Sequence, residues 1–411
     1  MSPTALSVCL AIAASAALGV YLRLRQIIVV ERNRLAPPED FAQTISIVEH
    51  RRAADYTAAG ARLAIGETIY HAALSLAWLS FGLGPLYAAV ARLTDPGLTR
   101  SLVIVLCFAA IGEALASPFS AAETFWLDAK FGLNRQSVSG FLADAARSLA
   151  LQLAIVAPLL YALFAAVRLS PDYWHIYAFL GFMLVVFGLV ALYPTLIAPL
   201  FNKFTPLPEG ELRNRLERLL ERCGFEAGGL YVMDASTRSS RGNAYFAGLG
   251  SSRRIVLFDT LIRRHSAAEI ESVVAHEIGH YKHGHLRHSL VLMAGVTLAG
   301  FFALRWALGP SGLAAAFVAP ADPGLGLVIA LLAKDPILHV LSPLFAWRSR
   351  RAEFEADAYA RSLVGQEPMI AALTRLMRDN LATLTPDRIY AQFYYSHPPA
   401  SVRVARLRET G

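Results

Sequence analysis

The segment ESVVAHEIGHYKHGHLRH, residues 271–288, holds five of the eleven histidines of this chain. Within it, the sequence HEIGH at 276–280 has the form H-E-x-x-H. Residues four apart share one face of a helix, so His276 and His280 can bind one Zn²⁺ while Glu277 lies beside the open position of the metal. The segment therefore predicts a helix that carries a zinc site with a general base next to it.

A motif of this length also recurs by chance, so the residues around it decide its weight. Ser266 and Glu269 precede it with the S-x-x-E spacing of a capping box, which predicts that the helix begins there. Downstream, His283 and Leu286 stand where a metzincin has glycine and histidine, so that class is excluded. His283 is also a poor third ligand, because at ~1.5 Å rise per residue it lies about 10.5 Å from His276.

The third metal ligand is expected from the segment RAEFEAD at 351–357. Glu353 and Asp357 are four residues apart and share a helical face, whereas Glu355 points in roughly the opposite direction. Glu353 can then bind the metal, and Asp357 can accept a hydrogen bond from a ligating imidazole. The alternative is that these acids only solvate a helix.

Composition places the motif in a membrane protein. Of the 411 residues, 55% are hydrophobic and 17% charged, and the mean hydropathy is +0.44. A soluble globular protein carries about 25% charged residues. A bilayer-spanning helix needs ~20 mainly apolar residues. Seven stretches qualify, at 4–22, 67–91, 101–120, 148–167, 173–196, 289–308 and 324–346. The first lacks a basic region before it and is expected to be a span, not a cleaved signal peptide.

Polar residues at or within the spans have two interpretations each. The histidines beyond the motif fit a polar helix end close to the membrane, with a second, weak metal site as the alternative; they are His283, His285 and His288. Charged residues inside a bilayer are costly, and three that lie inside predicted spans are Glu113, Lys334 and Asp335. They are expected to face one another or a water-filled cavity, unless these stretches lie nearer the interface.

Basic residues gather in alternate loops. The loop after the first span holds seven arginines, and the loop after the third holds Lys130, Arg135 and Arg147, whereas the loops after spans two, four and six hold few. The positive-inside rule therefore puts the amino terminus outside and the polar segments 201–288 and 347–411 in the cytoplasm. The formal charge of +7 then lies mainly where anionic lipid favours it, so nucleic-acid binding is not expected.

The chain divides into four blocks. Spans one to five with their loops occupy 1–200, a first polar block occupies 201–288, spans six and seven occupy 289–346, and a second polar block occupies 347–411. The first polar block begins with a helical pattern and continues with short alternating runs, which predict a small antiparallel sheet. The second block begins with a helix continuing out of span seven. The expected fold is mainly α, a seven-helix membrane part joined to a two-part cytoplasmic catalytic domain.

Several segments, taken in order, resemble the type I CAAX prenyl proteases, which are seven-span membrane zinc metalloproteases related to the smaller heat-shock membrane protease HtpX. They are FGLNRQS (131–137), PLFNKFTPL (199–207), RGNAYFAGL (241–249), RRIVLFDTLI (253–262), HEIGH (276–280), EFEAD (353–357) and YYSHPPASVR (394–403). This series covers nearly the whole chain and is far more specific than H-E-x-x-H alone.

The resemblance implies a gluzincin-type site with one zinc per chain, in which Glu353 is the third ligand. It also implies an edge strand that pairs with an extended substrate, mapping to Asn243, Ala244, Tyr245 and Phe246. His397 is then expected to contact the substrate or its oxyanion, with Arg403 just beyond it. The resemblance further implies that the seven helices ring a large intramembrane chamber capped by the catalytic domain.

The expected function is a zinc endopeptidase. Zn²⁺ would polarise the scissile carbonyl and lower the pKa of bound water. Glu277 would take the proton of that water and deliver it to the leaving amine, and His397 or Arg403 would stabilise the oxyanion. The expected substrates are membrane-associated, hydrophobic or prenylated CAAX-type proteins or peptides. Membrane lipid is the other expected partner, and the sequence sets no oligomeric state.

Two features bear on the compartment. The tail ends RLRETG, without a dilysine-like retention signal, and only four of the 38 basic residues are lysines. Both favour a homologue in a bacterial inner membrane over an enzyme of the endoplasmic reticulum. Quality control of membrane proteins, as by HtpX, is then the alternative to cleavage of prenylated substrates.

Two other functions fit less well. A site-2-type intramembrane protease buries H-E-x-x-H in a spanning helix, whereas the polar flanks of this motif favour a site at or above the interface. A zinc transporter would need histidine and aspartate facing each other within the spans, and the candidates considered for this are His71, His339 and Asp335.

Overall fold

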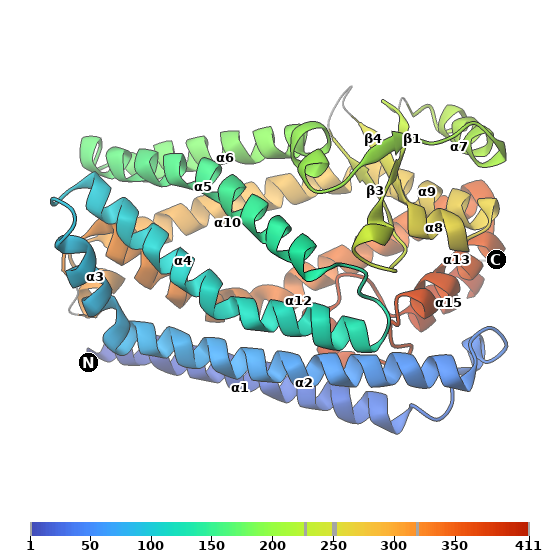
Figure 1. Ribbon diagram of the computed structural model, residues 1–411, viewed down its shortest axis with the longest axis horizontal. Helices are drawn as coiled ribbons and strands as arrows, with labels where there is room; N and C mark the ends of the chain where they lie inside the picture. The colour runs from blue at the N-terminus through green and yellow to red at the C-terminus, as the bar shows by residue number, and fades with distance from the viewer. Residues whose placement is uncertain (1, 226–227, 249–252, 318–319, 410–411) are drawn as a thin grey trace.

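The computed structural model describes residues 2–225, 228–248, 253–317 and 320–409. Leu249, which ends one of the segments quoted above, and the last two residues of the tail lie outside the described residues. Long helices make up most of the chain, and one small sheet lies at one end of the molecule (Figure 1). The expectation of a mainly α fold is confirmed.

Seven helical segments among the described residues are long and apolar enough to cross a membrane. They are α1 (Pro3–Arg32), α2 to α3 (Ile47–Ala77 and Leu83–Ala91, joined by η2, Trp78–Gly82), α4 with η3 (Leu98–Ala122 and Glu123–Asp128), α5 (Val138–Leu169), α6 with η4 and η5 (Trp174–Leu192, Tyr193–Ile197 and Ala198–Leu200), α10 (His285–Leu308) and α12 (Pro323–Val364). Short helices η1 (Glu39–Phe41) and α11 (Leu313–Ala316) lie in connections. Each predicted stretch lies within one of these segments, except that the fifth begins one residue before Trp174, so the seven-span prediction is confirmed.

The spans do not form a solid bundle. In the most apolar windows of α5, α6 and α10, only 6% of the residues are buried. A helix packed inside a solid bundle buries at least the face that it turns to its neighbours, so these three helices are packed less closely than that. One cavity of about 450 Å³ borders α1, α2 and α12, and another of about 300 Å³ borders α1, α2 and α4.

Charged residues of span seven follow the expectation from the sequence. Lys334 Nζ lies 2.6 Å from Asp335 Oδ1. Asp335 also borders the 450 Å³ cavity, together with Glu67 and Arg23. A charge that would be costly against lipid therefore has both an ion-pair partner and a polar space beside it.

The remaining elements form the domain that the sequence predicts to be catalytic. The first polar block contains β1 (Phe204–Pro206), α7 (Glu211–Arg222), β2 (Leu230–Met233), η6 (Ala235–Thr237), β3 (Ala244–Ala247), β4 (Arg254–Phe258), α8 (Asp259–Arg264) and α9 (Ala267–Lys282). The second contains the end of α12 followed by α13 (Gln366–Asp379), α14 (Arg388–Tyr394) and α15 (Ala400–Glu409). One hydrophobic core joins the blocks, since Leu219, Ile255 and Ile278 pack in the same cluster as Met369 and Leu407.

The sheet is mixed, so the prediction of an antiparallel sheet is wrong. Its strand order is β1-β2-β4-β3. β1 pairs antiparallel with β2, β3 pairs antiparallel with β4, and β2 pairs parallel with β4. The chain leaves β2, passes to the far edge to form β3, and returns as β4 beside β2. The chain reverses direction from β2 to β3 and again from β3 to β4, so β2 and β4 run parallel. The strand order places these two strands side by side.

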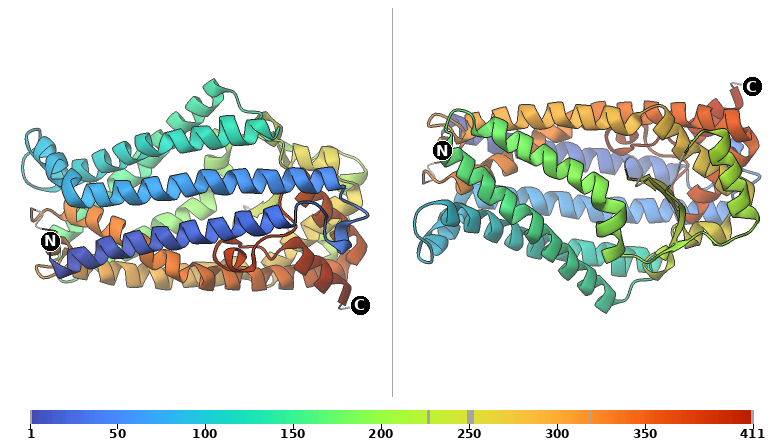
Figure 2. Two further views of the ribbon diagram at one scale, coloured as in Figure 1. Left: turned by 90° about the horizontal axis from the view of Figure 1, so that it is seen from below. Right: turned by 90° about the horizontal axis from the view of Figure 1, so that it is seen from above.

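The amino terminus and the catalytic domain lie at opposite ends of the molecule (Figures 1 and 2). The spans run along the long axis, with α1 and α2 side by side (Figure 2). The connections between α1 and α2 and between α4 and α5 lie at the same end as the catalytic domain (Figure 1). The arginine-rich loops and the catalytic domain therefore share one side.

Candidate metal centre

Helix α9 begins and runs as the sequence predicts. Ser266 N donates to Glu269 Oε2 at 2.7 Å, and Glu269 N donates to Ser266 Oγ at 3.3 Å, which completes the capping box. The helix then passes α12 with the backbones in contact. A Cβ atom at Gly279 would lie 2.9 Å from Ala356 Cα, so only glycine lets the two helices approach this closely. The crossing brings the H-E-x-x-H motif against the EFEAD segment.

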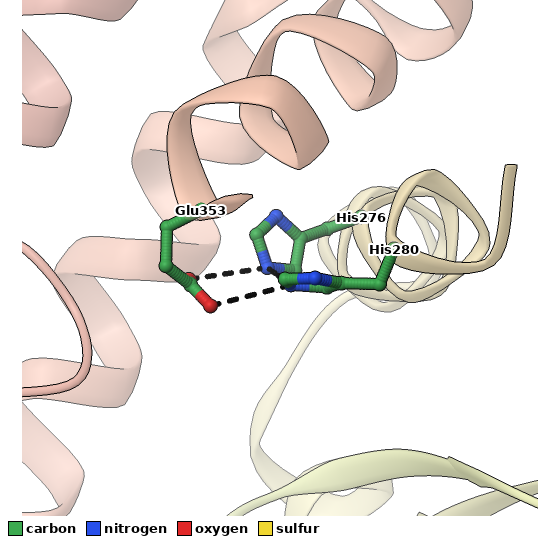
Figure 3. Close-up of side chains that lie close together, drawn as sticks. All are labelled: His276, His280 and Glu353. Carbon is green, nitrogen blue, oxygen red and sulfur yellow. Dashed lines mark hydrogen bonds and ion pairs between the residues drawn. The ribbon is translucent and has the colours of Figure 1, made fainter. Parts of the chain in front are cut away.

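Three side chains converge at this crossing (Figure 3). His276 Nε2 lies 3.1 Å from His280 Nε2 and 3.4 Å from Glu353 Oε2. His280 Nε2 lies 3.2 Å from Glu353 Oε1. Two ligand atoms at ~2.0–2.1 Å from a tetrahedral Zn²⁺ are about 3.3–3.4 Å apart. The three side chains are therefore close enough to bind one ion together, with a different oxygen of Glu353 nearest to each imidazole.

The chemistry of the group also fits a metal. His, Cys, Asp and Glu residues whose ligand atoms cluster could hold a metal ion. Among the described residues, such a cluster is formed by His276, His280 and Glu353, whose ligand atoms all lie within 4.8 Å of one another. Glu353 Oε2 is buried and accepts no hydrogen bond from the described residues. A buried carboxylate oxygen without a donor is costly, and a cation held between the two imidazoles would satisfy it.

Asp357 supports the group from behind. Its Oδ1 atom lies 2.9 Å from His276 Nδ1, the nitrogen that faces away from the candidate ligand atoms. Arg403 in turn donates to both oxygens of Asp357, from Nε at 2.8 Å and from Nη2 at 2.6 Å. Arg403 is buried, and its Nη1 atom lies 3.5 Å from Glu353 Oε2. Its guanidinium is thus engaged by the carboxylates of α12.

Glu277 and His397 border one cavity beside the three candidate ligands. The cavity has a volume of about 410 Å³, and Glu277, His276 and His397 are among its lining residues. Removal from solvent raises the pKa of Glu277, while His276 and His280 oppose the shift. His397 Nε2 lies 3.4 Å from Glu353 Oε1, and Ser396 Oγ lies 3.0 Å from His397 Nδ1.

Arg350 holds the segment just before His397 in place, a contact that could not be expected from the sequence. Its Nη1 atom donates to the carbonyl oxygens of Ala391 at 3.0 Å, Gln392 at 3.3 Å and Tyr395 at 2.8 Å. These carbonyls belong to the last turn of α14 and the residue after it. Arg350 therefore anchors the segment that carries His397 to α12.

The predicted substrate strand lies at the edge of the sheet. Ala244, Tyr245 and Phe246 belong to β3, which pairs with β4 and with no other strand of the described residues. Asn243, just before the strand, lines the same cavity as Glu277. Asn380 holds the segment that leads into β3, since it accepts a hydrogen bond from Gly242 N at 3.0 Å and donates one to Gly242 O at 3.1 Å.

The other polar residues near the motif do not join the three candidate ligands. Glu355 instead lies 3.0 Å from His285 Nε2, and His283 stacks on His285 with ring centroids 5.6 Å apart. The contact that sequence reasoning missed is 2.9 Å between His285 Nδ1 and His280 Nδ1. Its one sequence signal is the glycine at 284, which allows the chain to turn back between the two histidines.

The residues considered for metal transport do not form a comparable group. His71, His339 and Asp335 all border the 450 Å³ cavity among the spans. His339 is engaged by Ser15 Oγ at 2.8 Å and Tyr394 OH at 3.1 Å. α9 is also absent from the helices, among those described, that could span a membrane. The geometry thus gives little support to a transporter or to a site-2-type protease.

Comparison with known proteins agrees with this geometry. Residues 26–203 match the family model described as "CAAX prenyl protease N-terminal, five membrane helices", and residues 206–411 match "Peptidase family M48". CAAX prenyl protease 1 of Saccharomyces cerevisiae is 32% identical over 418 residues, covering 94% of this chain and 91% of its own length. The CAAX prenyl protease 1 homolog of Oryza sativa is 38% identical, covering 71% of this chain and 69% of its own length.

A solved structure extends the likeness to the whole fold. The crystal structure of S. mikatae Ste24p superposes with a TM-score of 0.93 at 29% identity, covering 99% of both chains. With two matched family models spanning nearly all of the sequence, the chain belongs to peptidase family M48, in the group with the membrane helices of the CAAX prenyl proteases, and is an integral-membrane metallopeptidase.

Proposed function

We propose that the protein is a zinc endopeptidase whose ion is held by His276, His280 and Glu353. The observation that supports it most is the mutual spacing of 3.1–3.4 Å between the three side chains, close to that of ligands around tetrahedral zinc. A bound zinc would act as a Lewis acid on the scissile carbonyl and would acidify a water molecule. Asp357 would keep His276 in the tautomer that offers Nε2.

Glu277 would be the general base and then the general acid. It follows His276 on α9 and borders the cavity beside the candidate ligands. Glu277 is not expected to bind the metal itself, because His276 and His280 occupy the face of α9 that lies toward Glu353. The raised pKa of the Glu277 carboxyl group, caused mainly by removal from solvent, makes its carboxylate a stronger base. Glu277 would accept the proton of the attacking water and pass it to the leaving amine.

We assign the oxyanion contact to His397 and a supporting role to Arg403. Arg403 is buried and bound to Asp357 through two nitrogens. His397 has an exposed side chain that borders the cavity, so it can reach a substrate. Donors aimed at developing negative charge lower the barrier of acyl transfer. Arg403 would instead hold Asp357 against His276.

The substrate would bind in an extended conformation beside β3. The free edge of a strand offers main-chain donors and acceptors to an added peptide strand. The residues from Asn243 to Phe246 would supply this edge, next to the cavity that holds Glu277. The scissile bond would then lie between the strand and the metal ligands.

The names of the relatives and the open interior support membrane-associated, CAAX-type substrates. The yeast and rice relatives are named CAAX prenyl proteases. The cavity beside Glu277 shares Tyr394 with the 450 Å³ cavity and Tyr395 with the 300 Å³ cavity among the spans. A hydrophobic or prenylated segment would find room there while its peptide reaches the ligands. Cleavage of damaged membrane proteins, as by HtpX, is the second candidate, favoured only by the expected bacterial compartment.

The test is cleavage of a synthetic peptide with and without a farnesyl group by the purified protein in detergent. We expect a larger kcat/KM for the farnesylated peptide and loss of cleavage on zinc chelation. Equal kcat/KM values for both peptides would favour the quality-control function. Cleavage that survives removal of all zinc would reject the metallopeptidase site.

His397→Ala should slow turnover while leaving zinc in place. Loss of one oxyanion donor typically lowers kcat about 10²–10³-fold. Because His397 is not among the three candidate ligands, the variant should retain its zinc. Elemental analysis and steady-state kinetics measure both quantities. Loss of zinc in His397→Ala would mean that the histidine is itself a ligand.

We propose a bacterial plasma membrane with the amino terminus outside and the active site on the cytoplasmic side. The arginine-rich loops and the catalytic domain lie at one end of the molecule, opposite the amino terminus (Figure 1), and the positive-inside rule assigns that end to the cytoplasm. Reporter fusions after Gly411 and within the loop 93–99 should give opposite topology readings. Matching readings would contradict the arrangement with seven spans and termini on opposite sides.

A further inference from the structure

The second imidazole of the motif has a partner that comes from beyond the end of α9. Gly284 has φ 66° and ψ 28°, a left-handed conformation that separates α9 from α10 and that glycine adopts without strain. The turn brings His285 back toward the motif. His285 Nδ1 lies 2.9 Å from His280 Nδ1, and His285 Nε2 lies 3.0 Å from Glu355 Oε2.

The protons of this chain of contacts can be assigned from the chemistry of its ends. If His280 offers Nε2 to a metal, its Nδ1 atom carries a proton and donates. His285 Nδ1 must then accept, so the proton of neutral His285 is on Nε2. That proton points to Glu355, a carboxylate that can only accept when ionised. Each nitrogen and oxygen in this series of contacts is thus either a donor or an acceptor, and no two donors face each other.

His285 is held in this orientation from several sides. Its side chain is only 13% exposed. The ring of His283 stacks on it at an interplanar angle of 15°. Arg351 Nε lies 3.7 Å from Glu355 Oε1, on the other oxygen of that carboxylate. A ring fixed in this way can hold the ring of His280 in turn.

The arrangement parallels the one behind His276. There, Asp357 lies against Nδ1 and is itself bound by Arg403. Both outer acids and Glu353 lie within the five residues 353–357 of α12. One helix segment would therefore supply a ligand and the support for both imidazoles, directly for His276 and through His285 for His280.

We propose that His285, oriented by Glu355, is a positioning residue that fixes the tautomer and direction of His280 for metal binding. The inference rests on the proposed zinc site. It assigns separate roles to histidines that the sequence leaves equivalent, because His283 and His288 make no comparable contact with a candidate ligand.

The test is the zinc dissociation constant of the full-length protein in detergent, measured by competition with a chromophoric chelator. Loss of a partner behind a metal-ligating histidine typically weakens metal binding about 10–100-fold, and we expect a loss of this size in His285→Leu. In His285→Asn the amide oxygen can replace the accepting Nδ1 atom, so most of the affinity should return. His288→Leu is the matched control, since His288 is an exposed histidine three residues further along α10.

Two further measurements separate positioning from folding. Glu355→Leu removes the acceptor at the outer end of this series of hydrogen bonds. The Glu355 side chain is 44% exposed, so this variant should fold, and its zinc affinity should fall several-fold. The visible absorption of the Co²⁺-loaded protein should change in His285→Leu and be restored in His285→Asn.

The outcomes are distinct. The inference would be overturned if His285→Leu bound zinc with wild-type affinity. If His285→Leu failed to fold, wild-type zinc affinity in Glu355→Leu would overturn it instead. So would an asparagine variant as weak as the leucine variant. A wild-type protein that binds no zinc would overturn the proposed zinc site as well as this inference.

Discussion

The Glu277→Gln protein is expected to bind zinc as the wild type does and to cleave peptide about 10²–10⁴-fold more slowly, the range that loss of a general base typically produces. Glutamine has nearly the shape of glutamate but cannot accept the proton of the attacking water. Because His276, His280 and Glu353 remain, the candidate ligand set is intact. The measurements are zinc content by elemental analysis and single-turnover cleavage of a farnesylated peptide.

Peptide affinity completes this experiment. Main-chain bonds to β3 do not involve Glu277, so an uncleaved peptide should bind the variant and the wild type equally. A Glu277→Gln protein with wild-type kcat would reject the assigned base and the hydrolytic mechanism built on it. A variant without zinc would instead show that Glu277 helps to hold the metal.

Glu353→Ala should lose the metal, whereas Glu355→Ala should still purify with about one zinc per chain. Removal of a direct ligand should lower the zinc affinity by more than the ~10–100-fold that follows the loss of a residue hydrogen-bonded to a ligand. Glu353 is buried and faces both imidazoles, while Glu355 is part-exposed and contacts His285 and Arg351 instead. Elemental analysis after identical purification compares the two variants.

This pair of variants separates the two glutamates of one helix turn. Both changes remove one carboxylate from α12, so a general loss of helix charge affects them equally. Retained zinc in Glu353→Ala together with lost zinc in Glu355→Ala would reverse the assignment. Loss of zinc from both would mean that the site tolerates no change in this segment.

Much of the fold could be predicted because its causes are local in the sequence. A run of ~20 apolar residues crosses a bilayer as a helix regardless of its neighbours, and all seven predicted stretches lie in such helices. The capping box of α9 is likewise formed by residues three apart. The four-residue spacings of His276 with His280 and of Glu353 with Asp357 set which side chains share a face.

The direction of strand pairing could not be predicted in this way. Short alternating runs indicate strands, but they do not say which strands are neighbours. β4 pairs with both β2 and β3, and its residues Ile255 and Leu257 pack in one core with α7 and α9. The sequence alone therefore favoured the simpler antiparallel sheet, and tertiary packing produced a mixed one.

The sequence by itself determined the seven spans, the helix that carries H-E-x-x-H and the residue types able to hold a metal. Only the tertiary structure decided how they meet. The close crossing of α9 and α12 at Gly279 places Glu353 3.2–3.4 Å from the two imidazoles. Packing of α15 on α12 brings Arg403 to Asp357, and the turn at Gly284 sets His285 against His280. These contacts join residues from separate helices, so no local pattern in the sequence specifies them.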